Sequence, residues 1–255
     1  MKAMLIGGAG FVGKHLAIHL ANTYGWEIVI TGLPEEREAI ERSSLGRFIP
    51  VNILEKGQIQ AVLEQERPHY IFHLAAQSSV ARSWKNPQAT IDVNVKGCAN
   101  LLDAIHSVEI YDPKILLIGS GDEYGRLPDG IRVVSETTLP CPGNPYAMTK
   151  AALVGLTKCL AVEYANRNIR VNCSQLGYAR TPMVEKMALE SNPENPEAAI
   201  ADIAVGVPMK RLAKPIEVGE LFAFLGSDES SYLTGSQIVI DGGSTLPETM
   251  SIGTN

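Results

Sequence analysis

Strand-like and helix-like segments alternate along the 255 residues, and this alternation constrains the fold more than any other feature. Short apolar runs predict strands at 3–6, 27–31, 47–51, 69–73, 114–119, 169–174 and 237–240. Segments with helical periodicity lie between them, at 12–23, 35–43, 56–66, 89–106, 146–166 and 216–226. Such an order produces a parallel sheet covered by helices on both faces. We expect a single α/β domain over 1–255, built on a doubly wound parallel sheet of about seven strands.

Composition and charge exclude several classes of protein. Hydrophobic residues make up 45% of the chain, which is typical of a globular domain and not of a disordered one. The net charge is −6 and no run of Lys and Arg occurs, so neither nucleic acid nor an acidic membrane surface is an expected partner. No apolar run reaches the length of a membrane span, and the apolar start meets glycine too soon for a secretory signal.

The four cysteines form no C-x-x-C pair and no cluster with histidine, so no metal site is expected. We interpret them as reduced and structural, which fits a cytoplasmic protein. They are Cys98, Cys141, Cys159 and Cys173.

A glycine-rich turn follows the first predicted strand and opens the first predicted helix. It reads Gly7-Gly8-Ala9-Gly10-Phe11-Val12-Gly13. Small residues allow the backbone to turn tightly and to approach a pyrophosphate, which then lies at the helix N-terminus. The glycine pattern alone is weak, but its position between a strand and a helix is the context that dinucleotide binding requires. We therefore predict a Rossmann-type cofactor site here, against the alternative of a turn that is tight for packing alone.

The end of the second strand bears on the choice of cofactor. An acid there accepts a hydrogen bond from the ribose 2′-OH of NAD, whereas a basic residue meets the 2′-phosphate of NADP. Gly32 stands at the usual acid position, which slightly favours NADP(H), with Arg37 as a phosphate contact. Glu35 or Glu36 reaching the ribose is the alternative, and a solvated helix start is the simplest reading of all three charged residues.

A phenol and an ammonium stand four residues apart, at Tyr146 and Lys150, and share one face of a predicted helix. A free tyrosine has a pKa near 10, and a neighbouring Lys cation is expected to lower it. Ser120 ends a predicted strand, at the sheet edge where ligands of α/β proteins bind. Most Tyr-x-x-x-Lys pairs are solvated helix faces, but this position favours acid–base chemistry on a carbonyl or alcohol.

These motifs, in this order, resemble the short-chain dehydrogenase/reductase family, with His73-Leu74-Ala75-Ala76 and Asn94 completing the series. The resemblance implies that Tyr146 is the general acid/base, that Lys150 binds the nicotinamide ribose and tunes Tyr146, and that Ser120 orients the carbonyl. It assigns Asn94 to a proton relay through water, although the side chain could equally satisfy helix backbone groups. Implied cofactor contacts are Gly7, Gly10, Phe11, Val12, Gly13, Gly32, Asn52, Leu74, Ala75, Ala76, Tyr146, Lys150, Gly177, Ala179 and Thr181.

The two parts of the chain resemble different branches of that family. Residues 1–150 are similar to the extended branch that acts on nucleotide sugars, through segments such as Gly119-Ser120-Gly121-Asp122-Glu123-Tyr124-Gly125. Residues 151–255 are similar to the compact branch of small alcohol and ketone dehydrogenases, through segments such as Leu233-Thr234-Gly235-Ser236. We interpret the chain as a mosaic joined near 146–150, with a single divergent lineage as the alternative, and 183–209 as a substrate lid.

The leading functional hypothesis is hydride transfer between NAD(P)(H) and a small ketone or secondary alcohol. A nucleotide-sugar reductase or dehydratase is the first alternative: Asp122 falls where sugar dehydratases carry an acid, although a turn role is simpler for it. A cofactor-binding sensor or chimera without turnover is the second. The resemblance further implies a homodimer or homotetramer that pairs the helices at 89–106 and 146–166.

Overall fold

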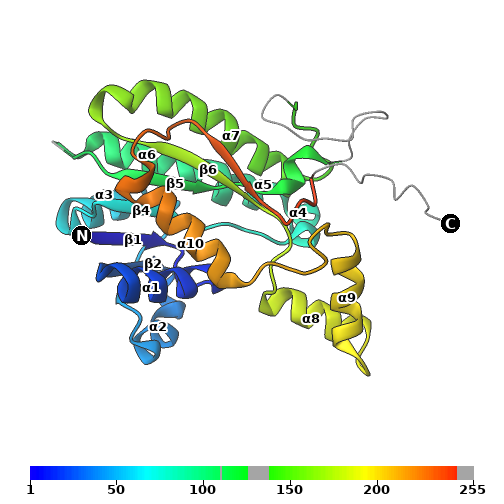
Figure 1. Ribbon diagram of the computed structural model, residues 1–255. Helices are drawn as coiled ribbons and strands as arrows, with labels where there is room; N and C mark the ends of the chain where they lie inside the picture. The colour runs from blue at the N-terminus through cyan, green and yellow to red at the C-terminus, as the bar shows by residue number, and fades with distance from the viewer. Residues whose placement is uncertain (110, 126–137, 246–255) are drawn as a thin grey trace.

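Seven parallel strands form one sheet in the computed structural model, which describes residues 1–109, 111–125 and 138–245 (Figure 1). The order across the sheet is β3-β2-β1-β4-β5-β6-β7, and every neighbouring pair is parallel. The predicted doubly wound sheet is therefore confirmed. The strands are β1 (Lys2–Ile6), β2 (Glu27–Gly32), β3 (Arg47–Pro50), β4 (Tyr70–His73), β5 (Lys114–Ile118), β6 (Val171–Leu176) and β7 (Gln237–Ile240).

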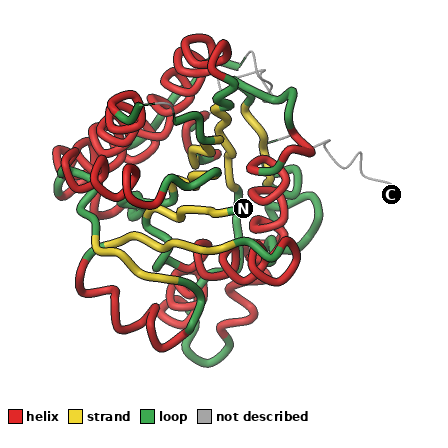
Figure 2. Tube along the Cα trace, turned by 90° about the vertical axis from the view of Figure 1, so that its left-hand side faces the viewer, coloured by secondary structure: helices red, strands yellow, loops and turns green. Residues whose placement is uncertain are grey.

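Helices cover both faces of this sheet (Figure 2). The α-helices are α1 (Phe11–Tyr24), α2 (Arg37–Ser43), α3 (Lys56–Glu66), α4 (Val80–Lys85), α5 (Pro87–Ile91), α6 (Gly97–Ser107), α7 (Pro145–Tyr164), α8 (Pro182–Ser191), α9 (Pro196–Val205) and α10 (Pro215–Gly226). Short helical turns are η1 (Pro34–Glu36), η2 (Asp92–Lys96), η3 (Gly121–Tyr124), η4 (Ala165–Arg167) and η5 (Asp228–Ser230). Among the described residues, no helix combines the length and apolar character needed to cross a bilayer.

Two hydrophobic cores follow from the alternation of side chains along the strands. On one face, Leu5 of β1 packs with Leu16 of α1 and Phe222 of α10. On the other face, Met4 of β1 packs in a cluster that includes Leu101 of α6 and residues of α3 and α7. Burial of each such large apolar side chain contributes about 2 kcal/mol. The two cores hold the strands in one layer and so fix where their ends lie.

Two predicted segments differ from the structure. The helix expected at 89–106 is divided into α5, the π-helical turn η2 and α6. The segment 183–209, predicted as a substrate lid without assigned helices, contains most of α8 and all of α9, which share a small apolar core of their own. Each of these helices starts with a capping side chain followed by proline: Thr181 accepts from the Val184 N–H and Asn195 from the Ala198 N–H. Their weak periodicity concealed them in the sequence.

The order in which strands are added to the sheet changes side between β1 and β4. These strands are neighbours, although β2 and β3 separate them in sequence and lie on the other side of β1. Helices leave opposite faces at such a point and open a crevice at the carboxyl ends of the strands. In Figure 1, α8 and α9 lie beyond those same ends. The topology therefore places the predicted cofactor turn, catalytic residues and lid around one crevice.

Candidate active site

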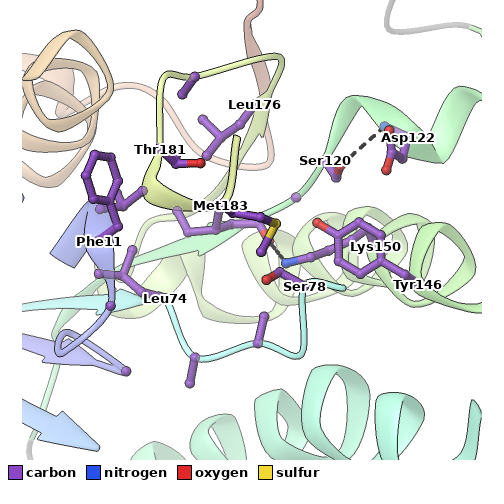
Figure 3. A pocket seen from close by; sticks show the side chains of 18 of the residues that line it. Phe11, Leu74, Ser78, Ser120, Asp122, Tyr146, Lys150, Leu176, Thr181 and Met183 are labelled. Atoms are coloured by element: carbon purple, nitrogen blue, oxygen red, sulfur yellow. Dashed lines mark hydrogen bonds between the residues drawn. The ribbon is translucent and has the colours of Figure 1, made fainter. Parts of the chain in front are cut away.

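A cavity of about 1550 Å³ occupies the carboxyl ends of the strands. Ser120, Tyr146 and Lys150 lie in its wall, and Figure 3 shows Phe11 at some distance from them along the same cavity. Asn94 lies outside its described lining. The residues predicted to contact the cofactor all line it: Gly7, Gly10, Phe11, Val12, Gly13, Gly32, Asn52, Leu74, Ala75, Ala76, Tyr146, Lys150, Gly177, Ala179 and Thr181.

The glycine turn leaves space that side chains would fill. Gly7 has a φ of +75°, and a Cβ there would lie 2.5 Å from the Cα of Ala75 on the neighbouring loop. Gly10 is the N-cap of α1, so no side chain covers the first backbone N–H groups of that helix. Exposed N–H groups and the helix dipole favour an anion. The turn therefore fits the pyrophosphate of a dinucleotide.

The end of β2 differs from the expectation of a basic contact. Glu36 lines the cavity, and its carboxylate accepts a hydrogen bond from the Leu33 N–H at 2.8 Å. The same carboxylate fills the space that a side chain on Gly32 would occupy. Arg37 lies outside the described lining; its guanidinium pairs with Glu41 at 3.2 Å and lies over the ring of Phe48. The geometry thus supports the acid alternative and not the phosphate contact at Arg37.

Local structure places Tyr146 at the start of α7. The helix begins after Asn144, whose Oδ1 accepts from the Ala147 N–H at 2.8 Å, and Pro145 occupies the first helical position. Tyr146 therefore stands in the first turn, where its side chain reaches back toward the sheet edge. Ser120, which follows β5 directly, lies close enough to lower the pKa of the Tyr146 phenol. The two hydroxyls converge on one end of the cavity.

Lys150 lies one turn further along α7, with its Nζ 5.8 Å from the centre of the Tyr146 ring. The side chain is buried, and the ammonium donates to the carbonyl of Ile118 at 2.7 Å (Figure 3 shows its position). Burial lowers the pKa of Lys150 to about 8, because desolvation disfavours the charged form.

The pKa of Tyr146 differs from the expected one. Burial raises it, the hydrogen bond with Ser120 lowers it, and the nearby charge of Asp122 raises it. The expected lowering by Lys150 is not found, because desolvation dominates at this phenol and the ammonium is directed at a backbone carbonyl. Tyr146 consequently retains its proton across the neutral range.

Asn94, predicted as a relay residue, connects two segments of the structure through hydrogen bonds of its side-chain amide. Its Oδ1 accepts from the Gln77 N–H at 2.8 Å, and its Nδ2 donates to the Gln77 carbonyl at 3.1 Å and to Thr149 Oγ1 at 2.9 Å. Thr149 Oγ1 in turn donates to the Tyr146 carbonyl at 2.7 Å. Both hydrogens of the amide therefore take part in hydrogen bonds that link the loop after β4 to α7.

Other residues in the wall had no assigned role in the sequence. Asp241 lines the cavity, and its carboxylate accepts from the N–H groups of Gly243 at 2.8 Å and Thr245 at 2.6 Å. Leu176 and Met183 add apolar surface to the wall of the cavity (Figure 3). The Asp-Gly-Gly sequence was a visible turn signal, but only the parallel pairing of β7 with β6 brings it to the cavity.

Asp122 and His73 are two further ionisable residues of this region. Asp122 lines the cavity, and burial raises the pKa of its carboxyl. His73 ends β4, is buried, and lies outside the described lining. Burial lowers the pKa of His73 to about 3, so its ring is neutral.

Comparison with known proteins agrees with this geometry. The model of the NAD dependent epimerase/dehydratase family matches residues 3–182. The oxidoreductase UcpA of Escherichia coli is 38% identical over 268 aligned residues, which cover 98% of this chain and 97% of UcpA. The GDP-6-deoxy-D-mannose reductase of Pseudomonas aeruginosa is 31% identical over 156 residues, or 61% of this chain and 45% of that protein.

A solved structure of levodione reductase is similar over almost the whole fold. It has a TM-score of 0.75 and 25% identity, with coverage of 96% of this chain and 97% of the other. The family model and the full-length relative both assign the chain to a known class of enzyme. The chain therefore belongs to the NAD dependent epimerase/dehydratase family and is an NAD(P)-dependent oxidoreductase of the short-chain dehydrogenase/reductase type.

Proposed function

We propose that this protein interconverts a small ketone and the corresponding secondary alcohol, with Tyr146 as the general acid/base. The observation that carries the proposal is the convergence of Ser120, Tyr146 and Lys150 in the wall of one cavity that begins at the glycine turn. A bound nicotinamide would supply or accept the hydride. The chain's own residues donate the proton, orient the carbonyl and bind the cofactor.

Each of the three side chains has a separate task in reduction. Ser120 Oγ donates a hydrogen bond to the carbonyl oxygen of the ketone and so fixes its orientation. Tyr146 Oη gives its proton to that same oxygen, which becomes the hydroxyl of the alcohol. Lys150 would hold the ribose that carries the nicotinamide. The raised pKa of Tyr146 suits this direction, because the phenol holds its proton until the oxygen becomes basic.

The walls near Tyr146 favour a compact substrate with an apolar part. Leu176, Tyr178 and Met183 supply apolar surface to the same cavity, and α8 and α9 act as the lid. The residues that follow α7 form β6, β7 and α10, which complete the same sheet and its helical layer. The name of the similar levodione reductase also refers to a ketone.

For the cofactor we propose NAD(H) in place of the slight sequence preference for NADP(H). The carboxylate of Glu36 would accept from a ribose 2′-OH and would repel a 2′-phosphate. Exchange of Glu36 for glutamine is expected to lower the preference for NADH over NADPH by about tenfold, since one charge–charge repulsion of about 1.4 kcal/mol is removed. Glu35→Gln, on the same turn but outside the described lining, is the control.

Nucleotide-sugar reduction is the second candidate, because Asp122 places a carboxyl group in the wall of the cavity. In that case the carboxyl of Asp122 takes part in proton transfer on the sugar. The partial likeness to GDP-6-deoxy-D-mannose reductase supports the same idea. Turnover of a GDP-keto sugar, but of no simple ketone, would favour this function.

The decisive experiment follows NADH and NADPH absorbance with a panel of ketones and a GDP-keto sugar. Tyr146→Phe is expected to lower kcat by at least about a thousandfold, the scale of a lost general acid. Its cofactor affinity should stay within about twofold, because the ring remains in place. Undiminished turnover in Tyr146→Phe would refute the mechanism. Cofactor binding without turnover in the wild type would indicate a sensor.

A further inference from the structure

A carboxyl group lies inside the protein directly behind the catalytic serine. Glu123, on the turn η3, has no exposed surface, and neither has Gln175 on β6. Glu123 Oε1 accepts a hydrogen bond from Gln175 Nε2 and a second, at 3.3 Å, from Gln237 Nε2 at the start of β7. The mechanism proposed above makes no use of this carboxyl.

Each side chain of this pair also has one oxygen without a hydrogen-bond partner among the described residues. In the described part of the chain, Glu123 Oε2 and Gln175 Oε1 are both buried and have no hydrogen-bond partner. Both are acceptors when the carboxyl is ionised, and a buried acceptor without a donor destabilises the folded state. A proton on Glu123 Oε2 supplies the missing donor, because the resulting hydroxyl can donate to Gln175 Oε1. Both oxygens then take part in a hydrogen bond. Two planar groups that already share one hydrogen bond then share two.

We propose that Glu123 is a neutral carboxylic acid in the folded enzyme, paired with the carboxamide of Gln175, and that this pair positions the turn carrying Ser120. Glu123 is a positioning residue: it holds η3 against β6 and β7 and touches neither substrate nor cofactor. The positioning part rests on the proposed role of Ser120. The protonation part stands on the buried contacts alone.

The charged groups around Glu123 do not change its assignment as a neutral carboxylic acid. From α7, the ammonium groups of Lys150 and Lys158 act on Glu123 and favour its ionised form. From β6, Cys173 adds a thiol whose pKa burial raises to about 12, so that it is neutral. On η3 itself, Asp122 adds a neighbouring acid.

Within the described segments, the further hydrogen-bond partners of Glu123 are uncharged. From β7, Gln237 contributes a carboxamide. From the segment 138–144, the N–H of Cys141 donates to the Glu123 carbonyl at 3.0 Å. Burial outweighs the two ammonium groups and raises the pKa of Glu123 to about 8.

A pH dependence of stability follows from the buried acid. In the unfolded chain the carboxyl has its ordinary pKa near 4.5, so between about 4.5 and 8 the folded protein binds one proton more than the unfolded one. The contribution of the protonated pair is complete below pH 4.5 and is lost as the pH rises toward 8. Across that range the unfolding equilibrium constant should increase about tenfold per pH unit from this group.

The variant Glu123→Gln isolates this effect. A glutamine can donate from its Nε2 to Gln175 Oε1 and accept from Gln175 Nε2, so it reproduces the neutral pair at every pH. The unfolding constant of the wild type, divided by that of Glu123→Gln, is expected to rise about a hundredfold between pH 5 and pH 7 in urea unfolding. Glu123→Leu keeps the burial but loses the pair, and serves as the matched control.

Activity provides an independent readout. With the same ketone assay, Glu123→Gln should keep kcat at pH 7 within about twofold, whereas Glu123→Leu should lose about tenfold or more because Ser120 is displaced. Rescue by glutamine but not by leucine separates positioning from simple packing. If the protein turns over no ketone, the unfolding experiment still tests the protonation state.

Two results would overturn the proposal. The first is a ratio of unfolding constants that stays flat between pH 5 and pH 7, which would mean that Glu123 is ionised. The second is equal loss of activity in the glutamine and leucine variants. If Glu123→Gln does not fold, carboxyl ¹³C signals of the labelled wild type decide: a glutamate that titrates near pH 8 supports the proposal, and titration of every glutamate below about pH 6 refutes it.

Discussion

At the scale of single residues, Lys150 shows that function and stability impose different demands on a side chain. The residue is only 4% exposed, and its ammonium donates to the Ile118 carbonyl. The pKa is lowered to about 8 from 10.5, so the folded protein binds fewer protons than the unfolded chain between these values. The cost of holding the charge is therefore complete below pH 8, and it declines as the pH rises toward 10.5.

Replacement of Lys150 by methionine is expected to stabilise the protein while abolishing turnover. At pH 7 the free energy of unfolding should rise by roughly 1 to 3 kcal/mol, because a buried charge is replaced by an apolar chain of similar length. The gain should shrink between pH 8 and 10.5. Urea unfolding measures it, with Lys186→Met on the exposed face of α8 as a control that changes stability by less than about 0.5 kcal/mol. A destabilised Lys150→Met would contradict the argument.

At the scale of secondary structure, helix starts carry a common signal. α5, α7, α8 and α9 each begin with proline, preceded by a capping Asn or Thr. The cap satisfies a free N–H, and proline has none to satisfy. This signal places Tyr146 in the first turn of α7, and it could have revealed α8 and α9 despite their weak periodicity.

The exposed face of α7 carries an apolar stripe at helical spacing. Its members are Met148, Ala152, Gly155, Cys159 and Val162, and Val162 is 84% exposed. Small and apolar residues in such an arrangement allow two helices to approach closely. We therefore retain the proposal, made from family resemblance, that this helix pairs with a second copy of the chain.

A charge in this stripe should dissociate the assembly. Val162→Asp is expected to shift the protein to a monomer in sedimentation at concentrations where the wild type is a dimer or tetramer, because an unpaired carboxylate is costly in an apolar interface. Val205→Asp on α9, where the side chain is 66% exposed, is the matched control and should leave the assembly unchanged. A wild type that remains monomeric at high concentration would exclude the proposed pairing.

At the scale of the whole molecule, the two halves that resemble different branches share their cores. Leu153 and Val171 belong to the same apolar cluster as Met4 and Leu101, and Phe222 belongs to the cluster of Leu5. The mosaic interpretation remains a prediction. Whatever its origin, the fold has no interior boundary near 146–150 that would allow the halves to unfold separately.

Unfolding is therefore expected to be a single transition. Tryptophan fluorescence reports mainly on the first half, since both tryptophans, Trp26 and Trp84, precede residue 146. Circular dichroism reports on all helices. The two curves should coincide in urea, as shared cores require. A fluorescence midpoint clearly separate from the circular dichroism midpoint would show two independent units.

Bound cofactor should stabilise this single unit. The cavity wall combines the glycine turn, the ends of β5 and β6, and the turn after β7. NADH at a hundred times its Kd should add about 2.7 kcal/mol and raise Tm by roughly 5 to 10 °C. Tyr146→Phe should show the same rise. No change in Tm with either NADH or NADPH would contradict the cofactor site.

Sequence alone determined the fold class, the order of the strands, the glycine turn and the three side chains that we propose as catalytic. These depend on periodicity, turn chemistry and the spacing of neighbours, which are local properties. Asp241 escaped notice because its approach to the cavity depends on how β7 pairs with β6.

Only the tertiary structure decided the protonation and environment of these groups. It covered Gly32 with the carboxylate of Glu36, raised the pKa of Tyr146 where a lower one was expected, and enclosed Glu123 beside Gln175. Desolvation depends on every atom that covers a group, and those atoms come from strands and helices distant in the chain. Spacing along a sequence therefore identifies which side chains meet, but the packed interior sets their charge.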